Sequence, residues 1–130
     1  AGEYQPELDK SEQWNRGAYI AEAMGHCAEC HTPRNRFGTL NPELAYAGTR
    51  DGPDGELVPN ITTHQTTGIG RWDHDELREF LKFGELPDGE YAAGSMDPVI
   101  EGIRHLTPQD LEALIIYLRA LPPIDNKISG

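Results

Sequence analysis

The sequence is almost without valine. Of its 130 residues only two are Val, against twelve Leu and nine Ile, while Gly and Pro together occupy 24 positions. Aromatic residues make up only 8%. Because Gly and Pro favour turns, and strands favour β-branched and aromatic residues, this composition disfavours a β-sandwich and predicts short helices joined by long loops. A chain of this length has room for one domain.

Basic residues are scarce as well. Eleven Lys and Arg stand against 22 Asp and Glu, a net charge of −11 at pH 7. Such a chain has no excess of cations to neutralise phosphates, so nucleic acid and anionic lipid are poor candidates as partners. The acids are concentrated late in the chain, with nine acidic and two basic side chains over residues 73 to 101. Residues 14 to 36 carry two acidic and three basic ones.

Long hydrophobic runs are absent. No apolar stretch approaches the length of a membrane span, and no signal-peptide pattern stands at the N-terminus. Since the first residue is Ala1 rather than Met, we expect a mature protein from which a signal peptide has been removed. Residues 1 to 13 are expected to form an acidic N-terminal arm and residues 124 to 130 a C-terminal tail. Within them, residues 1 to 8 and 124 to 130 are expected to be loosely attached.

Three segments show helical spacing of their apolar residues. Each begins at a side chain that can cap a helix and ends at Gly or Pro. The expected helices run from Asp9 or Ser11 to Gly25, from Asp73 to Gly84, and from Thr107 to Pro122. Residues 37 to 71 fit neither helical nor strand spacing, and a loop of that length in a compact domain is expected to wrap a ligand.

The only two cysteines belong to one short motif, Cys27-Ala28-Glu29-Cys30-His31. The pattern C-x-x-C-H is typical of c-type haem attachment. Two thiols one helical turn apart can each add to a vinyl group of one porphyrin, and the next residue directs its imidazole at the iron. The motif therefore predicts one haem c, bound covalently through Cys27 and Cys30, with His31 as a ligand to the iron.

Three other interpretations of the cysteines stay open at this point. A thioredoxin-like dithiol would need strands around the motif, whereas the segment before Cys27 has a helical pattern. A zinc site would need further ligands, and no second CxxC or HxxxH spacing supplies them. The histidines available for it are His26, His64, His74 and His105. A plain disulfide would leave His31 and the long loop unexplained.

Haem iron needs a second axial ligand, or an open position, opposite His31. Met24 lies three residues before Cys27 on the same expected helix and cannot reach that face. Met96 lies in a loop with Gly and Pro before the last expected helix, flanked by polar residues, and is the preferred candidate. A bis-His haem would instead use His64, His74 or His105. A neutral thioether favours ferrous iron, so His/Met ligation predicts the higher reduction potential.

Further segments extend the motif along the chain. They are Gly17-Ala18-Tyr19-Ile20, Asn60-Ile61-Thr62-Thr63-His64, Thr67-Gly68-Ile69-Gly70-Arg71-Trp72, Pro87-Asp88-Gly89 and Leu106-Thr107-Pro108-Gln109-Asp110-Leu111. With them, residues 14 to 123 resemble the bacterial class I cytochromes c. The resemblance is closest to the single-haem modules in the cytochrome subunits of periplasmic alcohol and gluconate dehydrogenases.

The resemblance implies an all-α class I cytochrome c fold, in which three to five short helices and long loops wrap one haem, over residues 14 to 123. It implies that the first and last helices cross, with small residues allowing close approach to Tyr117. Those small residues are Gly17, Ala18 and Ala21.

The resemblance also assigns site residues by position. Cys27 and Cys30 would form the thioether bonds. His31 would be the proximal ligand of the iron and Met96 the distal one. The loop that contains Asn60, Arg71 and Trp72 would line the haem and its propionates, with Arg71 and Trp72 as hydrogen-bond donors. The alternative for Trp72 is a core aromatic.

The implied function is electron transfer without catalysis. The iron would cycle between Fe(III) and Fe(II), accepting electrons from a periplasmic dehydrogenase and passing them to a downstream acceptor. No catalytic triad or phosphate-binding loop is present, and a single C-x-x-C-H motif disfavours a dihaem peroxidase. The alternative is a haem-based gas-binding or sensor cytochrome with a labile distal ligand. The negative charge predicts a redox partner with a basic docking surface.

Overall fold

The computed structural model describes residues 5–92 and 94–128, so residues 1–4 of the expected N-terminal arm and 129–130 of the expected tail lie outside the described residues. Within these ranges the chain forms five α-helices and no strand, with only isolated β-bridges in the loops. The helices are α1 (Glu12–Tyr19), α2 (Cys27–His31), α3 (His74–Phe83), α4 (Met96–Ile103) and α5 (Pro108–Arg119). The predicted all-α class is confirmed.

The chain divides into two compact units. One consists of Ala1–Gly25 and Trp72–Tyr117 and is called the helical unit below. The other consists of His26–Arg71 and Leu118–Gly130 and is called the loop unit. None of the helices in the described ranges is long and apolar enough to cross a membrane.

Helix α1 begins where a serine caps it. The Ser11 hydroxyl accepts the backbone N–H of Trp14 at 3.0 Å, which makes Ser11, and not Asp9, the correct one of the two expected caps. The helix continues as a short π-helix, η1 (Ile20–Met24), and ends at Gly25, as predicted. The wider π turn bonds the Gly25 N–H to the Ile20 carbonyl.

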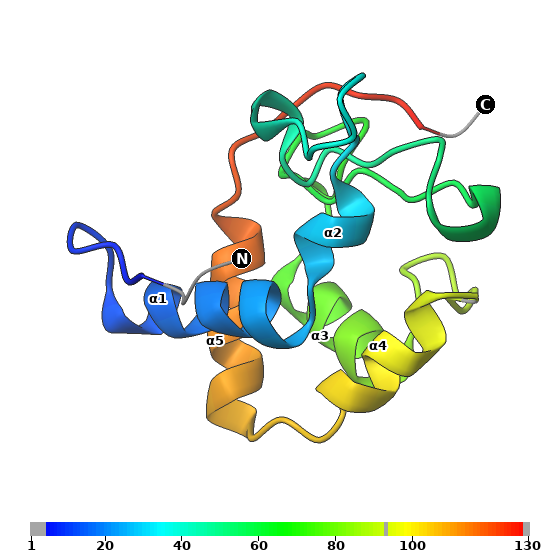
Figure 1. Ribbon diagram of the computed structural model, residues 1–130. Coiled ribbons are helices and arrows are strands. Elements are labelled where there is room, and N and C mark those ends of the chain that lie inside the picture. Colours follow the sequence, from blue (N-terminus) through cyan, green and yellow to red (C-terminus); the bar gives the residue numbers. More distant parts are fainter. Residues whose placement is uncertain (1–4, 93, 129–130) are drawn as a thin grey trace. The chain divides into compact units, whose positions relative to one another are not determined.

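Helices α1 and α5 cross in close contact inside the helical unit (Figure 1). A Cβ atom on Gly17 would lie 2.0 Å from the Ala113 carbonyl oxygen and 2.7 Å from the Tyr117 Cβ, so only glycine permits this approach. Beside the crossing the Trp14 and Tyr117 rings meet edge to face, 5.1 Å between centroids. The predicted crossing of the first and last helices is confirmed.

Helix α3 has both predicted ends. Asp73 and Glu76 form a reciprocal capping box, and Gly84 closes the helix in the left-handed conformation at φ 76°. Helix α5 also begins as predicted, because the Thr107 hydroxyl accepts the Asp110 N–H at 3.1 Å.

Helix α4 was not expected from the sequence, which placed Met96 in a loop. Met96 is instead its first residue, and Pro98 stands in its first turn. Proline is tolerated there because the first N–H groups of a helix have no partner inside the helix. The Gly and Pro content that suggested a loop is therefore compatible with a short helix.

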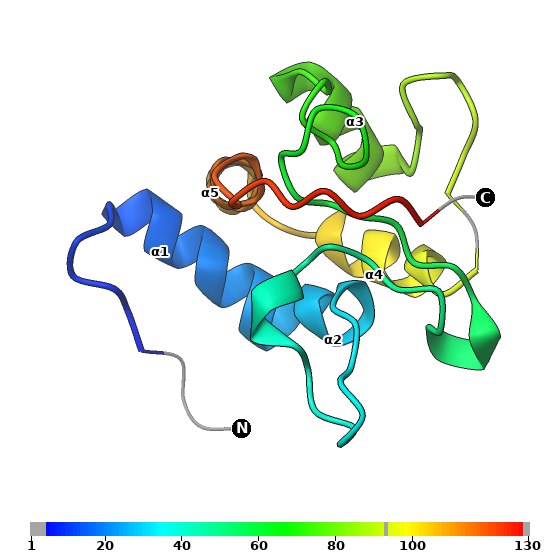
Figure 2. The same cartoon turned by 90° about the horizontal axis from the view of Figure 1, so that it is seen from above.

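The loop unit is held together by hydrogen bonds between loops and the C-terminal segment, defined here as residues 124–128. The Asn126 side-chain N–H donates to the Ala47 carbonyl at 3.0 Å, and Arg50 donates to the Lys127 carbonyl at 2.8 Å. Figure 2 shows the segment, in red, running beside the green loop of the same unit. The expectation of a loosely attached tail is wrong for residues 124–128. Hydrogen bonds to backbone carbonyls hold these residues, and no sequence pattern reveals such bonds.

The crossing of α1 and α5 gives a test of stability. We expect Gly17→Val to lower the free energy of unfolding by about 1–3 kcal/mol, since the added atoms collide with the backbone of α5. Guanidinium unfolding followed by far-ultraviolet circular dichroism measures it. Gly102→Ala in α4 is the control, because its Cβ would meet nothing within 4 Å. It should leave stability unchanged or raise it by about 0.5–1 kcal/mol; equal losses in both variants would contradict the close crossing.

Candidate functional site

The C-x-x-C-H motif forms a helix of a single turn. His26, with a positive φ of 51°, precedes α2 and turns the chain into it. Cys27 and Cys30 are three residues apart on this turn and therefore lie on the same side of it. Both are half-buried free thiols. The turn thus presents two thiols together and His31 directly after them.

The His31 ring is buried, with 5% of its surface exposed, and is fixed by one hydrogen bond. Its Nδ1 lies 2.8 Å from the carbonyl oxygen of Pro59. Since a carbonyl can only accept, Nδ1 carries the proton and Nε2 keeps a lone pair for a metal. Burial lowers the pKa of His31, and the bond to Pro59 opposes this by a smaller amount. A neutral, oriented imidazole is what an iron ligand requires.

A glycine ties the backbone of His31 to the same loop. The Gly48 N–H donates to the His31 carbonyl at 2.6 Å. Gly48 has a φ of +86°, and a Cβ atom on it would lie 2.6 Å from the Val58 oxygen and 2.7 Å from the Asn60 nitrogen. Only glycine therefore allows the His31 backbone and the Val58–Asn60 segment to come together.

The two thiols do not resemble a redox-active dithiol. Burial raises the pKa of Cys27 to about 11, and the neighbouring Cys30 acts in the same direction. Thiols of disulfide-exchange enzymes have a lowered pKa, because the thiolate is the attacking species. The arrangement suits a protonated thiol held for addition, and the thioredoxin-like interpretation finds no support.

The interpretation as a zinc site also finds no support. Over residues 5–92 and 94–128 no three His, Cys, Asp or Glu side chains are grouped closely enough to hold a metal ion. Three of the four other histidines have local partners. His64 accepts the Thr67 N–H at 3.1 Å, His74 pairs with Glu112, and His105 lies 3.6 Å from Glu101.

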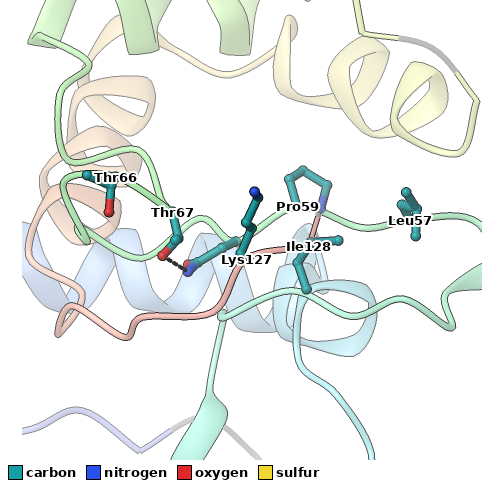
Figure 3. A pocket seen from close by; sticks show the side chains of 7 residues that line it. Leu57, Pro59, Thr66, Thr67, Lys127 and Ile128 are labelled. Atoms are coloured by element: carbon teal, nitrogen blue, oxygen red, sulfur yellow. Dashed lines mark hydrogen bonds between the residues drawn. The ribbon is translucent and has the colours of Figure 1, made fainter. Parts of the chain in front are cut away.

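A cavity of about 470 Å³ opens beside the residue that holds His31 (Figure 3). Its lining is Leu57, Pro59, Asn60, Thr66, Thr67, Lys127 and Ile128. One part of the wall is apolar, from Leu57, Pro59 and Ile128, and the other carries hydroxyls and the Lys127 ammonium. A porphyrin has an apolar ring with two carboxylates at one edge, so the lining fits such a group in chemical character. Cys27, Cys30 and His31 are not among the lining residues. The two thiols and the oriented imidazole fit the covalent attachment of a haem by their own chemistry.

The other predicted site residues divide between the two units. Asn60 lies in the loop unit on the cavity wall and is buried, and Arg71 is exposed at the end of that unit. Trp72 belongs to the helical unit, where it is half-buried and packs edge to face on Phe80, 5.6 Å between centroids. Met96 is half-buried at the start of α4 in the helical unit.

The sequence did not reveal Pro59 or the C-terminal segment as parts of the site. Pro59 acts through its backbone carbonyl, which any residue has, so its side chain carries no signal. Its place next to the Asn60-Ile61-Thr62 segment, which the resemblance marks, is the one available hint. The thiol turn, the oriented imidazole and the adjoining cavity define the class: a protein that holds haem through a C-x-x-C-H motif.

Comparison with known proteins agrees with this class. The family model described as Cytochrome c matches residues 14–122, and the chain belongs to the cytochrome c family. Membership implies covalently bound haem c, for which Cys27 and Cys30 supply the motif, and a role in electron transfer.

Several relatives are cytochrome subunits of dehydrogenases. The fructose dehydrogenase cytochrome subunit of Gluconobacter japonicus is 38% identical over 113 residues, 86% of this chain and 23% of that protein. The gluconate 2-dehydrogenase cytochrome c subunit of Pantoea cypripedii is 34% identical over 125 residues, 91% of this chain and 28% of that protein. The cytochrome c subunit of the quinone alcohol dehydrogenase of Gluconobacter oxydans is 33% identical over 128 residues, 92% of this chain and 27% of that protein. The chain thus spans less than a third of the length of each of these relatives.

Covalent attachment can be tested directly. We expect haem to stay with the denatured wild-type protein through acid–acetone extraction, because thioether bonds survive it. The double variant Cys27→Ala, Cys30→Ala should lose the haem completely, as measured by haem staining after denaturing electrophoresis. Ala28→Ser, between the two thiols, is the control and should keep it. Extractable haem in the wild type would refute the attachment.

Proposed function

We propose that the chain is a single-haem electron-transfer cytochrome of the periplasm, which accepts electrons from a dehydrogenase and passes them to a downstream acceptor. The observation that carries the proposal is the buried, neutral His31 ring, held by Pro59 directly after the two thiols. The dehydrogenase subunits among its relatives support the identity of the electron donor. In this role the chain transforms no substrate itself, although it can serve inside an enzyme complex.

The chain's own residues prepare an iron site that changes oxidation state with little rearrangement. When bound, haem supplies a one-electron Fe(III)/Fe(II) couple. Cys27 and Cys30 fix it covalently, and His31 offers Nε2 from a ring that burial and the Pro59 bond hold still. A ring held in this way would need little rearrangement when the bound group gains or loses an electron.

We propose Met96 as the distal ligand. It is half-buried in the first turn of α4, whereas Met24 has 53% of its surface exposed on η1. Three histidines could replace it: His64, His74 and His105. Each already contacts a backbone amide or a carboxylate nearby. A thioether ligand places the potential above that of a bis-His haem.

The charge distribution supports docking through the helical unit. Its residues carry sixteen acidic and five basic side chains, which accounts for the whole net charge of −11. The loop unit carries six of each and is neutral. A redox partner with a basic docking surface would therefore be attracted to the helical unit, with an association rate that falls as salt rises.

The ligation of Met96 has a spectroscopic test. We expect Met96→Ala to lose the weak far-red sulfur-to-iron band of the ferric protein, to lower the reduction potential, and to bind carbon monoxide rapidly when reduced. Met24→Ala, the exposed methionine, is the control and should change none of these.

Carbon monoxide also separates the carrier from the gas-binding alternative. With Met96 on the iron, the reduced wild type responds slowly or not at all. Rapid, stoichiometric binding by the wild type would contradict the carrier and favour the sensor. Absence of a haem c α-band in the purified, reduced protein would refute both.

Docking charge can be tested with a small cationic reductant, hexaammineruthenium(II). We expect its rate with the ferric protein to fall with ionic strength, and the triple variant Glu79→Gln, Glu85→Gln, Glu90→Gln to weaken that dependence. The control removes three acids from the loop unit: Glu43→Gln, Asp51→Asn, Asp54→Asn. Stopped-flow absorbance measures both. Equal effects in the two triple variants would show that the charge acts globally and would contradict docking at the helical unit.

A further inference from the structure

The side chain of Asn60 is completely engaged inside the loop unit. It is buried, with 3% exposed. Its amide N–H groups donate to the Ile124 carbonyl at 2.7 Å, the Thr67 hydroxyl at 3.2 Å and the Asn126 carbonyl at 3.3 Å. Its amide oxygen accepts the N–H and the hydroxyl of Thr62, at 2.9 and 2.7 Å. The two amide hydrogens of Asn60 already bond to three acceptors, so neither is free to bond to a haem propionate.

The C-terminal segment also donates hydrogen bonds to the loop that contains Asn60. The Ile124 N–H donates to the Thr62 hydroxyl and the Asn126 N–H to the Thr67 hydroxyl, both at 3.1 Å. Thr62 has no exposed surface. Its hydroxyl donates to Asn60 and accepts from Ile124, and therefore links the two sides of the network. Just before the segment, the Thr63 hydroxyl donates to the Leu121 carbonyl at 2.6 Å. The segment and the Asn60–Thr67 loop are therefore bonded to each other over several residues.

This network ends one peptide bond away from the support of His31. The carbonyl that accepts the His31 Nδ1–H belongs to Pro59, and the planar Pro59–Asn60 peptide joins it rigidly to the Cα of Asn60. Pro59 has a ring-restricted φ, which removes one way for that peptide to rotate. The remaining orientation of the carbonyl therefore depends on how firmly Asn60 is held.

We propose that Asn60 is a positioning residue, and that residues 124–127 act as a strap which holds the Pro59 carbonyl, and through it the His31 ring, in place. The inference rests on the proposed function for the identity of His31 as iron ligand. This indirect role is additional to the place of Asn60 on the cavity wall. The strap acts on the ligand without touching the iron.

The strap has a consequence for the electronics of the ligand. A hydrogen bond from Nδ1–H raises the basicity of Nε2, and a more basic ligand stabilises ferric iron more than ferrous. Loosening the Pro59 carbonyl weakens that bond. The ring N–H then exchanges with solvent faster, and the reduction potential shifts to more positive values.

The test uses the haem-containing protein. Two substitutions interrupt the hydrogen-bond network and leave Asn60 in place, because replacing Asn60 itself would endanger folding. Thr62→Val removes the central hydroxyl at nearly constant volume, and Asn126→Ala removes the bond to Ala47. In both we expect the His31 ring N–H, followed by NMR of the ferric protein, to exchange on the order of tenfold faster. The reduction potential should also shift to a more positive value.

Gln65→Ala is the matched control. Gln65 is another amide in the same loop, and its side chain donates to the Gly70 carbonyl at 3.1 Å, away from the strap. Its replacement should leave the ring N–H exchange and the reduction potential as in the wild type. A purely structural role of the strap would lower stability in Thr62→Val and Asn126→Ala while leaving the ring exchange and the potential unchanged, and that result would overturn the proposal.

The outcomes separate this inference from the proposed function. A distal ligand other than Met96 would overturn the proposed ligation, yet the comparison of ring exchange between the variants would stand. Unchanged exchange in well-folded, haem-containing variants would overturn the strap while leaving the electron carrier intact.

Discussion

The hydrogen bond from the His31 ring to the Pro59 carbonyl is the interaction on which the rest of the site depends. It decides which ring nitrogen carries the proton, and so leaves the other nitrogen of a buried histidine with a free lone pair. The loop unit is built around it. Gly48 permits the close approach of the two backbones, and the peptide that carries the carbonyl is anchored through Asn60.

The helical unit contributes a different set of constraints. Its α1–α5 crossing depends on Gly17, where no side chain fits, and a bidentate pair between Arg16 and Asp110 at 2.9 Å lies on the same two helices. The pair lowers the pKa of the Asp110 carboxyl, mainly through the hydrogen bond from Arg16. Both side chains are partly exposed, so the pair adds little to stability.

Local signals predicted the elements that local chemistry controls. The caps at Ser11, Asp73 and Thr107 and the stop at Gly84 are short-range hydrogen bonds and backbone preferences, which the sequence shows directly. Helix α4 was missed because Pro98 and Gly102 lower its apparent propensity, although Pro98 stands in the first turn, where proline is tolerated, and Gly102 is the last residue but one. The C-terminal segment was missed because backbone carbonyls and short hydroxyl side chains hold it in place, and these have no periodic pattern.

The sequence by itself determined the chemistry of attachment: two thiols one turn apart, a histidine directly after them, and a family whose members carry haem. Its charge pattern determined where along the chain the acidic side chains are concentrated. Only the tertiary structure decided that Pro59 orients His31 and that Asn60 is bonded to the C-terminal segment. The physical reason is distance along the chain. Covalent neighbours fix the motif, whereas the bonds that position it join residues 28 and more than 60 positions apart, and only folding brings these together.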